Sequence, residues 1–424
     1  MTNPRKLLSI LILSILLAVL IVPVPVFAKP QNSTAHTAQI RFYVPPPNRD
    51  AIRQVAQLLK ARNKADARLI AEMIATPQAV WFTQGTPKSV KKDVQKTIKL
   101  AAIQHAIPVL VAYNIPFRDC AQFSAGGATT VQEYKDWIDG FAAGIGNAKA
   151  MVILEPDGLG IIPWYKQFRG TSAEAEGYEW CQPAEADEAT AADERFEMLN
   201  YAVDALKAKP NVSVYLDGTH SSWLGSGDAA HRLIQAGVAR ADGFFLNVSN
   251  YRFTEHLVKY GQWISDCIYL SQNSWWQVEW CASQYYPANP NDFSTWGLSD
   301  AAYDQAFMDT GLTRNPAEQA HFVVDTSRNG QGPWTPPSYP DPQDWCNPPD
   351  RGLGLLPTAS SGNPLIDAYF WVKIPGESDG ECTRGLGPAG TTVDPEWGLI
   401  DPGAGDWFPE MALDLVHNAN PPLP

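Results

Sequence analysis

Short apolar runs alternate with helix-like segments along most of the chain. The runs are apolar throughout rather than alternately polar, which is typical of strands buried on both faces. They predict strands at 79–83, 107–113, 151–155, 212–217, 243–247, 321–325 and 368–373. Amphipathic segments predict helices at 50–75, 87–105, 131–147, 188–208, 227–240 and 300–320. This alternation predicts an α/β fold with a parallel sheet, and seven strands favour a closed or nearly closed barrel. An open doubly wound sheet is the alternative.

Polar residues stand at the ends of most predicted strands. In a parallel barrel these ends form one rim, where active sites gather. The residues are Tyr113, Glu155, Asp157, Asp217, Asn247, Asn250, Asp325 and Lys373. Three long segments rich in Trp, Pro and Gly, at 251–299, 327–364 and 376–408, are expected to be loops over this rim.

The N-terminus has the pattern of a secretory signal. Arg5 and Lys6 precede an apolar run from Leu7 to Val22, and Val26-Phe27-Ala28 resembles a cleavage site. We therefore predict a signal peptide over 1–28, a short polar leader over 29–38, one domain over 39–420 and a secreted protein without membrane contact. An uncleaved N-terminal anchor is the alternative.

The composition excludes several classes of partner. The chain has 32 basic and 45 acidic residues, a net charge of −13, so nucleic acid and anionic membranes are poor partners. The cysteines form no CxxC and have no His pair nearby, so we expect no metal. An even number of cysteines in an exported chain predicts disulfides, although fifteen pairings are possible. They are Cys120, Cys181, Cys267, Cys281, Cys346 and Cys382.

Four aspartates at or beyond strand ends form the strongest chemical pattern. They are Asp119, Asp157, Asp217 and Asp379. Carboxylates that share one rim repel, so the pKa of at least one should rise. A carboxylic acid that stays protonated is what glycoside hydrolysis needs for its leaving group. Any one of these residues could instead cap a helix or bind loop amides.

Aromatic residues support the same chemistry. The chain has fifteen Trp, and Trp81, Trp223 and Trp345 lie near strand ends, where flat faces could stack on sugar rings. Core packing is the alternative for each. His220, beside the Asp217 strand end, could contact a ligand or be a core residue.

The chain contains seven motifs that are specific as an ordered set. They are YNIPFRDC (113–120), ILEPD (153–157), YLDGTH (215–220), NVSNY (247–251), DTSRNG (325–330), DWCN (344–347) and WVKIPGESDG (371–380). Together they resemble glycoside hydrolase family 6, the inverting cellulases, over about residues 39–420.

This resemblance implies a distorted, TIM-like barrel of seven parallel strands. It also implies cofactor-free hydrolysis of β-1,4-glucosidic bonds in cellulose and cello-oligosaccharides. By resemblance, Asp157 is the general acid, Asp119 keeps Asp157 protonated and organises the water, and Tyr113 distorts the sugar. Asp379 resembles the proposed base, and Asp217 a further site carboxylate. The residues that resemble sugar-binding positions are Trp81, Ser124, His220, Trp223, Asn250, Trp345, Lys373 and Glu377.

The resemblance also implies two disulfides, Cys120–Cys181 and Cys346–Cys382, which leaves Cys267 and Cys281 as a third pair.

Two positions depart from the family pattern. Ser124 matches a water-holding Ser only after a one-residue change in loop length, and Ser226 stands where some exo-acting members have a second Trp, so a distant product-side subsite is expected to be absent.

The mode of attack has two interpretations. The 251–299 and 381–408 segments are long enough to cover the site, and the Gly-Thr-His form of the His220 motif resembles exo-acting bacterial members. We therefore favour a monomeric cellobiohydrolase over an open-cleft endoglucanase. An inactive cellulose-binding or lectin-like protein is the alternative of another class, disfavoured because all four carboxylates are present.

Overall fold

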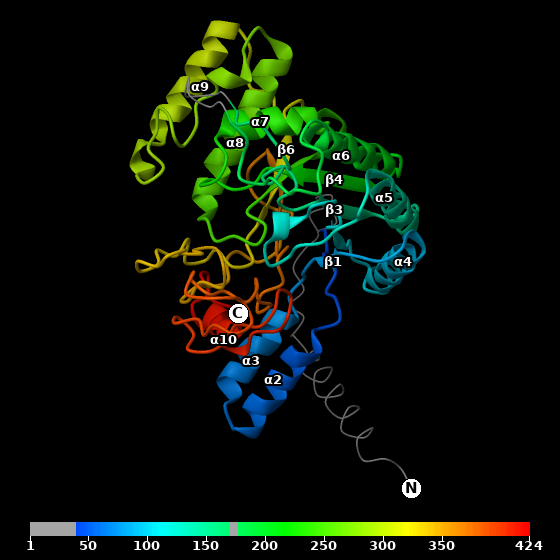
Figure 1. Ribbon diagram of the computed structural model, residues 1–424, viewed down its shortest axis with the longest axis vertical. Helices are drawn as coiled ribbons and strands as arrows, with labels where there is room; N and C mark the ends of the chain where they lie inside the picture. The colour runs from blue at the N-terminus through cyan, green and yellow to red at the C-terminus, as the bar shows by residue number, and fades with distance from the viewer. Residues whose placement is uncertain (1–39, 169–176) are drawn as a thin grey trace, which may run out of the picture. The chain divides into compact units, whose positions relative to one another are not determined.

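The computed structural model describes residues 40–168 and 177–424. The predicted signal peptide (1–28) and leader (29–38) lie outside these residues. Helices and strands carry the labels of Figure 1. None of the helices in the described residues is both long and apolar enough to cross a membrane.

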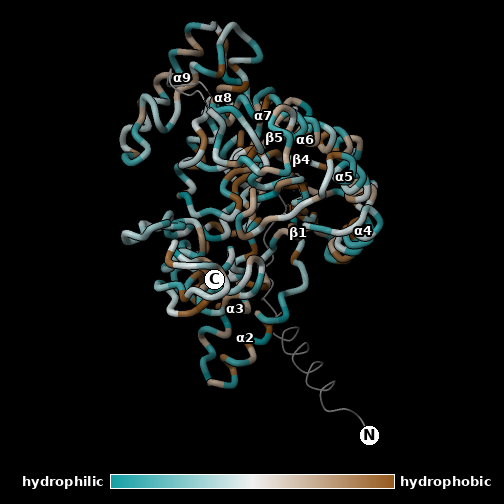
Figure 2. The backbone as a smooth tube through the Cα atoms, in the orientation of Figure 1, coloured by the Kyte–Doolittle hydropathy of each residue, from teal (hydrophilic) through white to brown (hydrophobic). Residues whose placement is uncertain are grey.

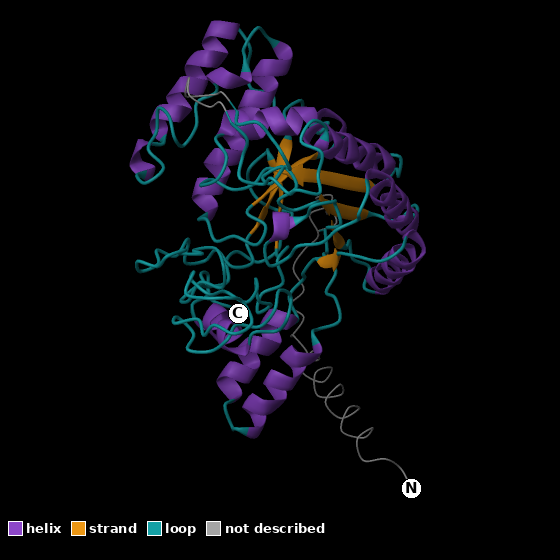
Figure 3. Cartoon of the chain, in the orientation of Figure 1, coloured by secondary structure: helices purple, strands orange, loops and turns teal. Residues whose placement is uncertain are grey.

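Seven parallel strands form one sheet in chain order (Figure 3). They are β1 (Val80–Phe82), β2 (Val109–Ala112), β3 (Ala150–Leu154), β4 (Val212–Asp217), β5 (Gly243–Leu246), β6 (His321–Asp325) and β7 (Ile366–Phe370). The two outermost strands approach each other, because the Ala79 amide donates to the Trp371 carbonyl over 3.0 Å. The sheet is thus a nearly closed, distorted barrel, as predicted.

Helices pack around the outside of the sheet (Figure 1). They are α4 (Pro87–Ile103), α5 (Val131–Ile145), α6 (Ala191–Lys207), α7 (Ser226–Gln235), α8 (Thr254–Asn273) and α9 (Gly297–Thr310). Along these helices hydrophobic and hydrophilic residues both occur (Figure 2), because one side of each packs against the sheet or, for α9, against α8. Three further helices, α2 (Arg49–Lys60), α3 (Lys64–Ile74) and α10 (Pro409–His417), pack around Trp371 and Trp407.

The strands are buried on both faces, which explains their continuous apolar sequence. Leu110, Val152 and Val214 face the surrounding helices. Val111, Ile153 and other residues fill the barrel interior. Apolar filling of the interior leaves the carboxyl-end rim as the place for polar side chains.

Three predicted elements have different bounds in the structure. The predicted helix 50–75 is two helices, because Arg62 takes a left-handed φ of 63° and Asn63 caps α3. The predicted helix 300–320 is α9 and ends at Gly311, where φ is 70°. The predicted strand 368–373 is β7, two residues earlier at its start and ending at Phe370.

The largest error concerns the 251–299 segment, which we predicted to be a loop. Its first half is α8, whose buried residues include Leu257, Trp263 and Ile264. The many aromatic and polar residues of α8 concealed its helical pattern. The α8 part of the segment therefore belongs to the barrel wall, while residues 281–288 pack on the loop after β4.

The three predicted disulfides are all present: Cys120–Cys181, Cys267–Cys281 and Cys346–Cys382. The first joins the loops after β2 and β3, and the third joins the loops after β6 and β7. Cys267–Cys281 fixes the chain after α8 against that helix. Two of the three disulfides thus connect neighbouring loops of the rim.

Candidate active site

A cavity of about 630 Å³ opens at the carboxyl ends of the strands. Every predicted site residue except Asp217 lines it. These residues are Trp81, Tyr113, Asp119, Ser124, Asp157, His220, Trp223, Asn250, Trp345, Lys373, Glu377 and Asp379. They come from loops after most of the strands, so the barrel brings together residues far apart in the sequence.

Asp157 lies on a tight turn after β3. The turn has left-handed backbone at Glu155 (φ 52°) and Asp157 (φ 62°). Burial raises the pKa of Asp157 well above its ordinary value, and the carboxylates of Asp217, Asp119 and Asp379 add to the effect. No hydrogen bond between described residues occupies its carboxyl group. These surroundings favour the protonated form of Asp157.

Two buried residues hold this turn: Glu155, which the sequence analysis placed at a strand end, and Arg195, which it did not select. The Glu155 carboxylate accepts the amides of Asn114 (2.9 Å) and Ile115 (3.0 Å). The Arg195 guanidinium donates to the carbonyls of Gly158 and Ile161 over 2.8 and 2.7 Å. Glu155 and Arg195 thus fix the strained backbone that presents Asp157.

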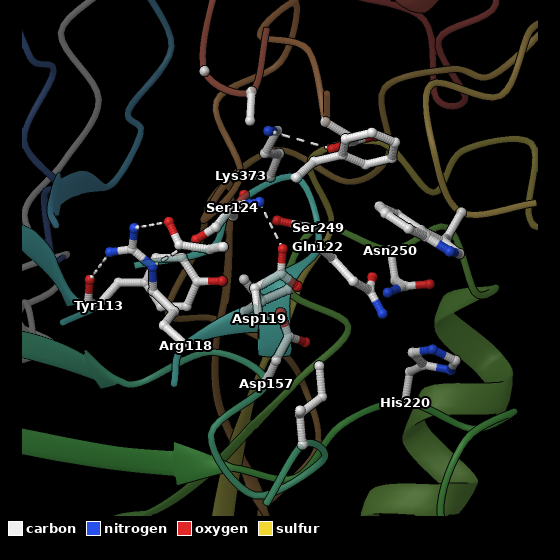
Figure 4. A pocket seen from close by; sticks show the side chains of 18 of the residues that line it. Tyr113, Arg118, Asp119, Gln122, Ser124, Asp157, His220, Ser249, Asn250 and Lys373 are labelled. Carbon is white, nitrogen blue, oxygen red and sulfur yellow. Dashed lines mark hydrogen bonds and ion pairs between the residues drawn. The ribbon is translucent and has the colours of Figure 1, made fainter. Parts of the chain in front are cut away.

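Asp119 faces Asp157 across the cavity, and Figure 4 shows their carboxyl groups close together. It belongs to a short left-handed stretch with φ of 60° at Asp119 and 43° at Cys120. Burial raises the pKa of Asp119 to about 6, although its Oδ2 accepts the Ser124 amide over 2.6 Å. Around neutral pH Asp119 is thus largely ionised and favours the protonated form of Asp157.

Arg118 organises the loop that carries Asp119. Its Nη1 donates to the carbonyls of Tyr113 (2.6 Å) and Thr83 (2.9 Å), and its Nε donates to the Ser124 carbonyl over 2.8 Å. The guanidinium also lies 4.6 Å from the centre of the Tyr113 ring. Arg118 therefore fixes the positions of Tyr113, Asp119 and Ser124 relative to one another.

Asp379 has the opposite environment. Its Oδ2 accepts from Arg328 Nη1 (2.9 Å), the Asn347 amide (3.1 Å) and the Tyr251 hydroxyl (3.2 Å), and its Oδ1 lies 3.3 Å from Lys373 Nζ. Burial alone would raise the pKa of Asp379, but Arg328 and Lys373 hold it below its ordinary value. Asp379 is therefore an ionised carboxylate.

Asp217 does not line the cavity, which corrects its predicted place among the site carboxylates. It is buried beneath the Asp157 turn and accepts the amides of Leu159 (3.2 Å), Gly160 (3.2 Å) and Thr219 (2.8 Å). Burial raises the pKa of Asp217 to about 6. It supports the turn and acts on Asp157 through its charge.

Aromatic and polar side chains line both ends of the cavity. At the β1 and β7 end, Trp81 donates to the Val372 carbonyl over 2.8 Å, and Asn48 donates to Glu377 over 3.1 Å. At the β4 and β5 end, the His220 Nδ1 accepts the Ser222 amide over 3.2 Å. Burial lowers the pKa of His220 well below its ordinary value, so the neutral ring presents its Nε2 proton.

The residues that sequence reasoning missed lie mostly inside the motifs. Arg118 precedes Asp119, Arg328 belongs to the 325–330 motif and Asn347 to the 344–347 motif. No pattern distinguished these buried positions from surface ones. Trp180, next to Cys181, lines the cavity and was not selected either.

Comparisons with known proteins agree with this geometry. Endoglucanase A of Thermobispora bispora is 31% identical over 392 residues, which are 92% of this chain and 64% of that protein. The chain thus spans a little under two thirds of that relative. The probable 1,4-beta-D-glucan cellobiohydrolase C of Neosartorya fischeri is 29% identical over 384 residues, covering 84% of this chain and 72% of that protein.

A solved structure is similar in both sequence and fold. The endoglucanase Cel6 from Mycobacterium tuberculosis is 33% identical, with a TM-score of 0.61, over 90% of this chain and 98% of that one. The family model for glycosyl hydrolases family 6 matches residues 37–419, which include every residue of the cavity. The chain therefore belongs to glycosyl hydrolases family 6.

Proposed function

We propose that this chain hydrolyses β-1,4-glucosidic bonds in cellulose and cello-oligosaccharides with inversion of configuration. The observation that carries the proposal is that two carboxyls of one cavity have opposite surroundings. Asp157 has no hydrogen-bond or ion-pair partner among the described residues, whereas Asp379 is paired with Arg328 and Lys373. Both endoglucanases and cellobiohydrolases occur among its relatives. The M. tuberculosis structure contains a thio-linked cellobiosyl cellobioside, a ligand of the proposed substrate class.

The proposed reaction is a single displacement. Asp157 donates its proton to the glycosidic oxygen while the bond from that oxygen to the anomeric carbon breaks. A water attacks the anomeric carbon from the opposite face and loses its proton to the base. This geometry requires acid and base carboxyls about 6.5–9.5 Å apart.

Asp379 is the proposed base. Among the described residues only Lys373 contacts its Oδ1, at 3.3 Å, whereas its Oδ2 accepts three hydrogen bonds. The Oδ1 atom is therefore the one able to receive the proton of the water. Asp119 and Ser124 organise that water, and the Tyr113 ring presses the reacting sugar out of its chair.

We further propose exo action with cellobiose as product, supported by a contact between two loops. The ring centres of Phe123, in the loop after β2, and Trp345, in the loop after β6, lie 5.9 Å apart. Gly380, in the loop after β7, also packs on Phe123, because a Cβ at position 380 would lie 2.5 Å from the Phe123 side chain. Since β1 stands between β7 and β2, this contact spans the end of β1, where Trp81 lies. The 251–299 segment contributes only Arg252 to the cavity, so it does not support the roof that we expected from it.

An open-cleft endoglucanase remains the second candidate, since relatives with that name are as similar as those named cellobiohydrolase. We propose secretion as a monomer, which the three disulfides support because such bonds persist in oxidising compartments.

Two assays test these proposals. Hydrolysis of cellohexaose, followed by separation of the product anomers, should give α-anomers at the new reducing ends, and no hydrolysis would favour an inactive binding protein. On carboxymethylcellulose, nearly pure cellobiose with little loss of viscosity would support exo action. A fast loss of viscosity would identify an endoglucanase. Phe123→Ala should raise activity on carboxymethylcellulose if the loop contact is a roof.

A further inference from the structure

Trp180 combines two properties that no other described residue shares. Its ring is 53% exposed, and among the large exposed apolar side chains of the described chain it is the one that lines the cavity. An exposed ring of this size forgoes the burial that folding favours. Its position therefore needs an explanation other than stability.

The backbone around Trp180 is anchored on both sides. Cys181 forms a disulfide with Cys120, and its carbonyl accepts the Trp164 amide over 2.9 Å. Glu179 forms an ion pair with buried Arg232 of α7, and its amide donates to the Tyr165 carbonyl over 2.8 Å. Trp180 is thus held between the loop that carries Asp119 and the helix that follows Trp223.

Trp223 lines the cavity next to His220, and Tyr285 lies beside Trp223, outside the cavity lining. Trp223 packs on Gly160, where a Cβ would lie 2.6 Å from its ring. The Tyr285 hydroxyl donates to the Trp223 carbonyl over 3.1 Å, and Tyr285 is 41% exposed. Tyr285 therefore continues the exposed aromatic surface outward from Trp223.

Ser226 shows why this surface could not be predicted from the motifs. Its side chain is fully buried and lies 3.2 Å from the Tyr303 hydroxyl, so position 226 faces the interior. Next to it, the 281–288 chain packs on the loop after β4, and Gln284 donates to the Leu224 carbonyl over 2.9 Å. The segment with Tyr285 therefore occupies the region beside Trp223.

We propose that Trp180 and Tyr285 extend the sugar-binding surface beyond Trp223 and form an additional binding subsite for a glucose unit of a β-1,4-glucan, on the His220 side of Asp157. The ligand class follows from the surface, because flat rings bury the C–H faces of a neutral sugar. The proposal rests on the proposed function, since it extends the path of the same substrate. It replaces the expectation that a distant subsite is absent.

Chain-length dependence tests the proposal. We would measure kcat/KM on cellotetraose and cellohexaose for the wild type, Trp180→Ala and Tyr285→Ala. Trp275→Ala is the matched control, because Trp275 is 57% exposed and does not line the cavity. Trp180→Ala should lower kcat/KM on cellohexaose about tenfold, with a clearly smaller loss on cellotetraose. Trp180→Phe should restore most of the loss.

The outcomes separate this proposal from the proposed function. If the wild type hydrolyses neither oligosaccharide, the proposed function fails. If the wild type is active and Trp180→Ala matches Trp275→Ala on both substrates, the subsite does not exist. An equal loss on both substrates, with an unchanged melting temperature, would place Trp180 beside the reacting sugar and also overturn the proposal.

Discussion

The two sides of the cavity hold the same kind of residue in opposite states. On the β2 and β3 side, Asp119 and Asp157 accept few hydrogen bonds, and burial raises the pKa of each. On the β6 and β7 side, Asp379 is the most buried of the three, but Arg328 and Lys373 hold its pKa below the ordinary value. Burial alone therefore decides nothing. Arg328 and Lys373 pair directly with Asp379, whereas no cation of the described residues pairs with Asp157, so the two carboxyls favour opposite protonation states.

Among the predicted changes, loss of the proposed proton donor, Asp157, should lower turnover most. Asp157→Asn retains the shape of the side chain but cannot protonate a leaving group, so turnover on cellulose should fall about 10²–10⁴-fold. Aryl cellobiosides with acidic phenols need little protonation and should lose much less. Steady-state kinetics on both substrates check this, and equal losses on both would remove the assignment of Asp157 as the acid.

Removal of the cation behind Asp379 should produce the next largest effect. Arg328→Gln removes one of the two cations that pair with the buried Asp379 carboxylate and leaves only Lys373, so the pKa of Asp379 should rise. As the proposed base, Asp379 acts when ionised, and its lowered pKa favours the ionised form at acidic pH. The acid limb of the kcat profile should therefore move to higher pH in the variant, and turnover near neutral pH should fall.

Arg328→Lys is the control for that experiment, since it keeps a positive charge. It should return the acid limb toward that of the wild type. If the acid limb of Arg328→Gln stays in place while the variant remains folded, as measured by circular dichroism, the titration of another group controls that limb.

Much of this asymmetry was not visible in the sequence. The apolar runs predicted the seven strands because each strand is buried on both faces. Because Asp157 and Asp379 follow the ends of parallel strands, the sequence also predicted that both lie on one rim of the barrel. Sequence position did not distinguish Asp217, which lies beneath the turn, from Asp157, which lies in the cavity. Likewise Arg328 and Asn347 acquire their roles only through contacts made across the barrel by loops far apart in the chain.

Substitution of Asp217, which is buried beneath the Asp157 turn, should have a moderate effect on the titration of Asp157. Asp217→Asn removes a negative charge near Asp157, so the pKa of Asp157 should fall toward its ordinary value. Because Asp157 acts when protonated, the alkaline limb of kcat should move to lower pH, by about one unit. A pH–rate profile measures this shift. A lower kcat with an unchanged alkaline limb would limit Asp217 to a structural role in the turn.

The smallest predicted effect concerns protein stability and a second buried carboxyl pair, Asp394 and Asp401, which lies behind Asp379. Asp401 Oδ2 accepts from Asn347 over 2.8 Å, and the side chain of that Asn accepts the amide of Asp379 over 2.7 Å. Burial, together with the neighbouring Asp394 carboxylate, raises the pKa of Asp401 to about 7. The folded state thus binds a proton that the unfolded chain releases above about pH 4, so stability should fall as the pH rises between these values.

Asp401→Asn should remove this pH dependence, because an amide stays neutral and can donate to Asp394 as the protonated acid does. The melting temperature of the variant should exceed that of the wild type by about 2 °C at pH 8, the shift that ~1 kcal/mol gives in a large domain. At pH 4 the two proteins should melt together, since the wild-type carboxyl is then protonated in both states. Asp341→Asn, an exposed substitution, is the control and should leave the difference between the two pH values unchanged. If Asp401→Asn is less stable than the wild type at both pH values, Asp401 is ionised in the fold. The hydrogen bonds to Asp379 would then depend on a second buried negative charge, and the two sides of the cavity would differ less than we infer.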